Sequence, residues 1–242
     1  MTRLYLPQPL SSGLELVLPD AAVRHLVQVL RMQAGENFIV FNGQGGEFEA
    51  VLTQVAKKSA TARVGEPQAA HRESPLDLTL AQCVSKGDRM DYTIQKAVEL
   101  GVTRLQPLLS VRSVVRLDAE RWDKKLEHWR GVIVSACEQS GRTRVPDLLP
   151  VQPLPGWLSA AGTRGTGLTL DPEGRHGLRE MPAPAGPVTL LVGPEGGLSA
   201  DELDAARRAG FIGIRMGPRV LRTETAGVAA LAALQAQWGD WQ

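Results

Sequence analysis

Apolar and polar positions alternate in several short segments within the first seventy residues of the chain. Such alternation is typical of half-buried β-strands. A helical turn is expected to begin at Pro19 and to end by Gly35, and a glycine-rich loop at 42–46 predicts a hairpin. The close spacing of the strands favours a small barrel. We therefore expect residues 1–70 to form a β-rich domain with strands near 4–6, 14–18, 38–41, 47–55 and 60–64.

After a linker at 65–75, the pattern changes to strands that alternate with helices. Apolar positions recur at helical spacing between Asp88 and Gly101 and between Trp122 and Cys137. The segment 146–167 is rich in proline and glycine and is expected to hold one strand at most. Alternation of strands and helices is typical of a parallel sheet covered by helices. Residues 75–242 are therefore predicted to form an α/β domain, with strands near 76–81, 102–109, 168–170, 188–192 and 211–216.

Two glycine-rich turns follow apolar strands in this second domain. The first, 193–197, precedes a helix that Ser199 and Glu202 should begin as a capping box, and the second starts at Gly217. We expect the two strands to be neighbours, so that the turns meet at the sheet edge where ligands bind. Glu195 would repel a phosphate, which favours a neutral or cationic ligand with hydroxyls and an amine. Alternatively, these glycines only satisfy the geometry of ordinary turns.

Composition excludes several classes of protein. The 242 residues are 43% hydrophobic and 22% charged, as in ordinary globular proteins. A net charge of +1 neither requires nor forbids nucleic acid, because a basic face can exist within a neutral total. Neither a signal peptide nor a membrane span is expected. Cys83 and Cys137 lie far apart without metal-ligand spacing, so we expect buried thiols, no metal and a reduced, cytoplasmic setting.

Basic residues recur at positions that suit contacts with phosphates. Three lie in the β-rich segment, and others lie near the ends of predicted elements in the second domain. For any single basic residue, the alternative to a phosphate contact is a solvated charge on the protein surface. As a set they predict RNA binding, with Arg3, Arg24, Arg31, Lys86, Arg112 and Arg142 as the expected contacts.

Longer motifs resemble one protein family. Residues 193–199 read GPEGGLS, and residues 216–226 read MGPRVLRTETA. Together they resemble the carboxyl-terminal signature of the RsmE family, the 16S ribosomal RNA uracil-N3 methyltransferases of the SPOUT superfamily. Further matches lie upstream in the same order, at 24–31, 96–102, 107–113 and 138–142. The departures, which are Met216, Pro218 and Val220, are conservative and concern only the packing of the cofactor.

The resemblance implies a fold and a set of partners. The fold is a PUA-like amino-terminal β-barrel that binds RNA, followed by a SPOUT methyltransferase domain, a parallel sheet flanked by helices that contains a trefoil knot. The implied partners are the 16S rRNA of the small ribosomal subunit and a second copy of the chain in a homodimer, with no membrane and no metal. The implied cofactor is S-adenosylmethionine, which carries no phosphate. The loops that would bind it map to Thr169, Leu170, Gly193, Glu195, Gly196, Gly197, Met216, Gly217, Val220, Leu221 and Thr225.

The implied reaction transfers the sulfonium methyl to N3 of a uridine. Because N3 carries a proton and normally pairs in a duplex, the base must be presented unpaired and the proton must leave. Arg222 could stabilise negative charge on a uracil carbonyl, and Glu224 or Glu195 could accept the proton. Alternatively, Glu224 only complements the dipole of its helix, and Glu195 only shapes its loop.

Two other functions are compatible with the sequence, and a third is disfavoured by it. One is a SPOUT methyltransferase that acts on another RNA, such as transfer RNA, or on ribose. Another is a non-catalytic RNA-binding protein of ribosome assembly. A nucleotide-dependent oxidoreductase is disfavoured, because the glycine cluster at 42–46 precedes a strand and no GxGxxG motif opens a helix.

Overall fold

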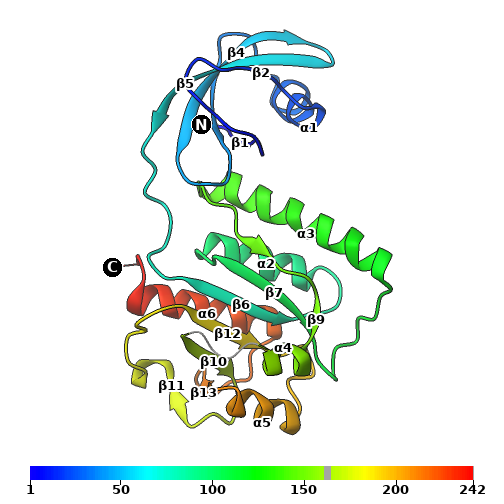
Figure 1. The fold of residues 1–242 in the computed structure, drawn as a ribbon, viewed down its shortest axis with the longest axis vertical. Helices are drawn as coiled ribbons and strands as arrows, with labels where there is room; N and C mark the ends of the chain where they lie inside the picture. Colours follow the sequence, from blue (N-terminus) through cyan, green and yellow to red (C-terminus); the bar gives the residue numbers. More distant parts are fainter. Residues whose placement is uncertain (161–164, 242) are drawn as a thin grey trace. The chain divides into compact units, whose positions relative to one another are not determined.

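A computed structural model describes residues 1–160 and 165–241 (Figure 1). The chain forms two compact units. The first comprises Met1–Glu73 and Cys137–Val145, and the second comprises Ser74–Ala136 and Pro146–Gln242. The sequence-based division placed 137–145 in the second domain, whereas the structure groups these residues with the first. Helix α3 (Ala119–Ser140) therefore contributes residues to both units.

The first unit is built on a five-stranded sheet with the order β1-β3-β4-β5-β2. Its strands are β1 (Arg3–Tyr5), β2 (Glu15–Val17), β3 (Asn37–Phe41), β4 (Glu47–Ala56) and β5 (Ser59–Gln68). β1 pairs with β3 in parallel, and the other pairings are antiparallel. The hairpin predicted around 42–46 is confirmed, because β3 and β4 pair across that loop. Alternate residues such as Leu16, Phe38 and Leu52 form the core of the unit.

The helical segment of the first unit differs from the prediction. Instead of one helix that ends at Gly35, a single turn α1 (Asp20–Val23) runs into a π-helix, η1 (Arg24–Val29). The backbone N–H of Leu30 donates to the carbonyl of His25, five residues back. Arg31 then turns the chain with a φ of 58°, which is rare for a residue other than glycine. The wide turn leaves the side chains of Val29 and Leu30 exposed to solvent.

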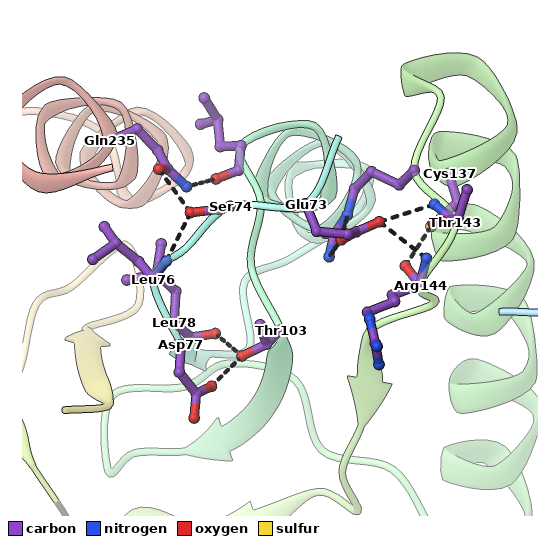
Figure 2. Close-up of polar contacts among 12 residues, drawn as sticks. Glu73, Ser74, Leu76, Asp77, Leu78, Thr103, Cys137, Thr143, Arg144 and Gln235 are labelled. Carbon is purple, nitrogen blue, oxygen red and sulfur yellow. Dashed lines mark hydrogen bonds and ion pairs between the residues drawn. The ribbon is translucent and has the colours of Figure 1, made fainter. Parts of the chain in front are cut away.

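Polar contacts of Glu73 hold the segment 137–145 in the first unit. Glu73 Oε1 accepts hydrogen bonds from the backbone N–H groups of Thr143 at 2.9 Å and Arg144 at 3.0 Å (Figure 2). Its Oε2 accepts from Arg142 Nη2 at 2.8 Å. Burial alone would raise the pKa of Glu73, but Arg142 and the two N–H groups outweigh burial and lower it. These contacts join residues about seventy positions apart, so hydrophobic periodicity could not predict them.

The second unit is built on an eight-stranded sheet in which every pairing is parallel. The strand order is β11-β13-β10-β12-β6-β7-β8, with β9 also beside β7. The strands are β6 (Leu78–Cys83), β7 (Arg104–Leu109), β8 (Asp147–Leu148), β9 (Gln152–Pro153), β10 (Thr166–Leu170), β11 (His176–Gly177), β12 (Val188–Val192) and β13 (Phe211–Arg215). The helical elements besides α3 are α2 (Arg89–Glu99), α4 (Leu154–Ala160), the 3₁₀ turn η2 (Leu178–Glu180), α5 (Ala200–Arg208) and α6 (Thr223–Trp238).

Two expectations about this sheet are wrong. β12 and β13 are not neighbours, because β10 lies between them. The segment 146–167 holds β8, β9, α4 and the start of β10 rather than one strand at most, while residues 161–164 lie outside the described part of the chain. Pro155 is compatible with α4 because it lies in the first turn, where its missing N–H is not needed. The trefoil knot stays a prediction.

Helices cover both faces of the second sheet (Figure 1). A Cβ at Gly227 of α6 would meet Leu80, Gln82 and Val192, so α6 lies on the face to which these side chains point. Leu154 of α4 and Ala206 of α5 share a core cluster with strand residues of the opposite alternation, including Ala81 and Leu191. The thiol of Cys83 is buried in that cluster, and the expectation of buried cysteines is confirmed for both residues. Burial also raises the pKa of Cys137 to about 12.

Asp91 connects α2 to α3 within the second unit. Its Oδ1 accepts from Trp129 Nε1 at 2.9 Å, and its Oδ2 lies 2.6 Å from His128 Nε2. Trp129 is fully buried, so it packs in the core and is not available to stack on bases. Burial alone would raise the pKa of Asp91, but His128, Lys125 and Trp129 outweigh burial and lower it.

We expect Asp91→Asn to destabilise the second unit by about 1–2 kcal/mol at neutral pH, because it removes a charge-assisted hydrogen bond. Since the folded-state pKa of Asp91 is lowered, its contribution is complete above the unfolded pKa. That contribution is lost as pH falls through the folded pKa. The free energy of unfolding can be measured by near-ultraviolet circular dichroism at several pH values. Its difference between the variant and the unmodified chain should therefore shrink as the pH is lowered. Glu120→Gln, which breaks only an exposed pair with Lys124, is the control, and an equal loss there would contradict the prediction.

Candidate active site

The carboxyl ends of three parallel strands surround a cavity of about 650 Å³ in the second unit. Loops after β10, β12 and β13 line it, so the strand that separates β12 from β13 supplies a third wall. Most of the predicted cofactor residues lie here, namely Leu170, Gly193, Glu195, Gly196, Gly197, Met216, Gly217, Val220 and Leu221. Thr169, which is buried in β10, and Thr225, which is exposed on α6, are not among the described residues that line the cavity.

The loop after β12 needs glycine at two positions for different reasons. A Cβ on Gly193 would lie 2.9 Å from the backbone nitrogen of Leu198, so a side chain there would force the loop apart. Gly197 has a φ of 69°, a conformation that other residues rarely adopt. The predicted capping box then begins α5 and is confirmed. Ser199 Oγ accepts from the Glu202 N–H at 3.2 Å, and Glu202 Oε2 accepts from the Ser199 N–H at 2.8 Å.

Two side chains fix this loop to its surroundings. Arg112 Nη1 donates to the carbonyl of Gly196 at 2.7 Å and, more weakly, to that of Leu198 at 3.3 Å. Thr223 Oγ1 donates to the carbonyl of Gly193 at 2.6 Å and accepts from Gln82 Nε2 at 3.0 Å. The start of α6 is therefore bonded to the same loop. The loop is held in shape by the chain itself.

Arg89 is a cavity residue that the predicted site did not include. It is the first residue of α2, which follows β6, the strand next to β12. Arg89 Nη1 donates to Glu195 Oε1 at 2.9 Å, and Arg89 Nε lies 3.7 Å from Glu224 Oε1. Because the ends of parallel strands meet at one edge, its place after a predicted strand was a usable signal.

The electrostatics of Glu195 follow from these contacts. Burial alone would raise the pKa of Glu195, but the backbone N–H groups of Lys86 and of Glu195 itself, together with Arg89, lower it below its ordinary value. The carboxylate therefore stays ionised at neutral pH. A negative charge in the loop is consistent with the prediction of a ligand without phosphate.

Family models match most of the chain. An RNA methyltransferase domain matches residues 72–235, and an RNA methyltransferase PUA domain matches residues 18–65. The ribosomal RNA small subunit methyltransferase E of Buchnera aphidicola is 32% identical over 98% of this chain and 97% of its own length. That of Bacillus subtilis is 34% identical over 89% of this chain and 87% of its own length. The chain belongs to the RsmE family.

Solved structures of similar proteins agree with this family. The RsmE protein of Neisseria gonorrhoeae, a crystal structure bound to S-adenosylmethionine, is 43% identical, with a TM-score of 0.95 over the whole of both chains. A putative methyltransferase of Legionella pneumophila, also in complex with S-adenosylmethionine, is 40% identical with a TM-score of 0.95. That match covers 99% of this chain and 98% of the other. The fold predicted from the RsmE resemblance, an α/β SPOUT domain with an amino-terminal PUA-like domain, is confirmed.

The arginines predicted to bind RNA fall into different environments in this RsmE-family chain. Arg24 and Arg31 are exposed on and beside η1. The side chain of Arg3 is buried and pairs with Glu47, and Arg142 is buried and pairs with Glu73. Since buried, paired guanidinium groups are not available to phosphates, the expectation for Arg3 and Arg142 is corrected to a structural role.

Arg112 lies at the cavity, and Lys86 is bonded to a cavity residue through its backbone. The backbone N–H of Lys86 donates to Glu195 Oε1 at 2.8 Å, and its side chain is exposed. Arg112 donates to loop carbonyls and lines the cavity. Charged residues outside the predicted site also line it, namely Asp171, Glu173, Arg215 and Arg219. No group of His, Cys, Asp or Glu side chains in the described part of the chain could hold a metal ion, and no helix there could cross a membrane.

Proposed function

We propose that this chain methylates N3 of a uridine in the 16S rRNA of the small ribosomal subunit, with S-adenosylmethionine as the methyl donor. The observation that carries the proposal is the three-loop cavity. Similarity over almost the whole length to proteins named ribosomal RNA small subunit methyltransferase E supports the choice of RNA. The cytoplasmic location and the homodimer expected from the resemblance belong to the same proposal.

The cavity suits the chemistry of this donor. S-adenosylmethionine supplies its methyl group from a sulfonium, and it presents hydroxyls, an amine and an aromatic base but no phosphate. Apolar side chains such as Leu170, Leu221 and Val220 would contact the base. Val220 is 82% exposed although it lines the cavity, as expected of an apolar side chain that a ligand covers. Glu195 and Glu224 on the cavity wall are both paired with Arg89, and a ligand without phosphate avoids repulsion from these two carboxylates.

Two residues at the start of α6 are proposed to act on the uracil. Arg222 is the N-cap residue of α6, exposed and on the cavity wall, where its guanidinium can stabilise negative charge on a uracil carbonyl. Glu224, in the first turn of α6, is proposed to accept the N3 proton. The rest of the cavity would position donor and base, because a sulfonium already has a good leaving group.

The decisive experiment uses small ribosomal subunits from a strain that lacks this protein. Purified protein and S-adenosylmethionine should introduce one methyl group, and mass spectrometry of the nucleosides should identify N3-methyluridine. A methyl on ribose, or modification of transfer RNA alone, would favour a SPOUT methyltransferase with another target. RNA binding without donor binding would instead favour a non-catalytic assembly protein.

We expect Arg24→Gln combined with Arg31→Gln to weaken binding to small-subunit RNA about tenfold and to lower the salt-dependence slope by up to about 2. Both residues are exposed beside the π-helix, an element that is often found at functional sites. Filter binding at several salt concentrations measures both effects, while donor affinity should stay unchanged. Arg63→Gln is the control, since Arg63 is an exposed arginine of the same unit that already pairs with Glu15. An equal loss of RNA affinity in the control and in the double variant would contradict a specific role for Arg24 and Arg31.

A further inference from the structure

Arg89 lies between two carboxylates that come from different walls of the cavity. Glu195 belongs to the loop after β12, Glu224 belongs to the first turn of α6, and Arg89 begins α2. One edge of the guanidinium faces Glu195 Oε1 at 2.9 Å, and its Nε faces Glu224 Oε1 at 3.7 Å. A single cation therefore connects three segments of the proposed active site.

The two carboxylates differ in how many hydrogen bonds their oxygens accept. Glu195 Oε1 accepts from the Lys86 N–H and from Arg89, so both of its contacts orient the loop. Glu224 Oε2, in contrast, is buried and has no hydrogen-bond partner among the described residues. An unsatisfied buried carboxylate oxygen is costly, and such atoms in native structures call for an explanation. Glu224 lines the cavity, so a small turn of its carboxylate would bring Oε2 to a ligand there that donates a proton or a hydrogen bond.

We propose that Arg89 is a positioning residue that acts through Glu224, holding Oε1 while Oε2 turns to the N3–H group of the substrate uracil. The inference rests on the proposed function and deepens it. The N3 proton passes to Glu224 Oε2, and the N3 electron pair forms the new bond to the methyl carbon. The carbon–sulfur bond breaks with its pair staying on sulfur, and Glu224 then releases the proton to water. The same arrangement engages Glu195 in structural contacts and leaves Glu224 as the base.

The chemistry of arginine explains why this residue type stands at position 89. A guanidinium is planar and rigid, so two of its edges can hold two carboxylates at a fixed separation, whereas a lysine ammonium is a point charge on a flexible stem. Without the guanidinium, two like charges would face each other across the cavity wall. Glu224 would then turn away from Glu195 and lose its fixed position.

A double-mutant cycle tests this assignment. Arg89→Gln, Glu224→Gln and the double variant are compared in single-turnover methylation of small subunits, with donor and RNA saturating. Each single change should slow the reaction by about 100-fold, in the range typical for loss of a general base. If Arg89 acts through Glu224, the double variant should be at most about threefold slower than Glu224→Gln. Donor affinity measured by calorimetry should change by less than about threefold in all of them, which corresponds to under about 0.7 kcal/mol.

Several outcomes would overturn the inference. If the fold-loss of rate in the double variant equals the product of the two single losses, the two residues act independently. A loss in Arg89→Gln that disappears at saturating donor would mean that Arg89 only shapes the donor pocket. Lys96→Gln is the matched control, because Lys96 is another cation of α2 whose partner, Glu99, lies outside the cavity lining, and its rate should equal that of the unmodified chain. If the unmodified chain does not methylate the subunits, the proposed function is overturned as well. If the unmodified chain is active but the rate losses of the two single variants multiply, only this inference is overturned.

Discussion

Replacing Gly193 by alanine should weaken S-adenosylmethionine binding by about 10- to 100-fold, equivalent to about 1.4–2.7 kcal/mol. The added Cβ would lie 2.9 Å from the backbone nitrogen of Leu198 and 3.1 Å from the carbonyl carbon of Gly197. Backbone atoms cannot move aside as a flexible side chain can, so the loop must open, at a cost typical of overpacking. Opening the loop would also disturb the 2.6 Å hydrogen bond from Thr223 to the Gly193 carbonyl. Isothermal calorimetry with the donor measures the loss directly.

Gly131→Ala is the control for this prediction. A Cβ at Gly131, on α3, would meet nothing within 4 Å, and Gly131 is not among the residues that line the cavity. We therefore expect donor affinity within about threefold of the unmodified chain. Both variants should retain the circular dichroism spectrum of the folded protein. Equal affinities in the two variants would contradict the claim that close backbone packing at Gly193 shapes the donor site.

Local features of the site could be predicted because they depend on residues adjacent in the sequence. The strand 188–192 is a continuous apolar run with glycine and proline after it, and the structure has the same bounds. Ser199 and Glu202 form the predicted capping box because their separation of three residues brings each side chain to the other's backbone N–H. The glycine loop between them is also local. Such signals placed two of the three cavity loops at the correct sheet edge.

Features that depend on distant partners could not be predicted. The insertion of β10 between β12 and β13 depends on how the chain crosses over the sheet, which an apolar run does not encode. The burial of Arg3 depends on Glu47, a partner 44 positions away. The residues next to Arg3 in the sequence do not distinguish a buried, paired arginine from an arginine on the surface. The pairing of Arg89 could not be predicted for a related reason, since its two carboxylate partners lie more than one hundred positions downstream.

Glu47→Gln should destabilise the first unit by about 2–4 kcal/mol at neutral pH, because it leaves buried positive charge without its counter-ion. Glu47 is 3% exposed and pairs with Arg3, whose guanidinium is also buried. It accepts two further hydrogen bonds from Arg72, at 3.0 and 3.1 Å. Burial alone would raise the pKa of Glu47, but the two arginines outweigh burial and lower it. Its stabilising effect is therefore complete above the ordinary carboxyl pKa and is lost as pH falls through the folded-state value.

Hydrogen exchange followed by mass spectrometry measures this effect unit by unit, which suits a chain whose unfolding need not be two-state. Amides of β3 and β4 should exchange faster in Glu47→Gln, while those of β12 in the second unit serve as an internal reference. The difference in amide protection between Glu47→Gln and the unmodified chain should shrink as the pH is lowered. Glu15→Gln removes only an exposed pair with Arg63 and should cost less than about 1 kcal/mol. Unchanged protection of β3 and β4 in Glu47→Gln would mean that the apolar core, rather than this ion cluster, sets the stability of the first unit.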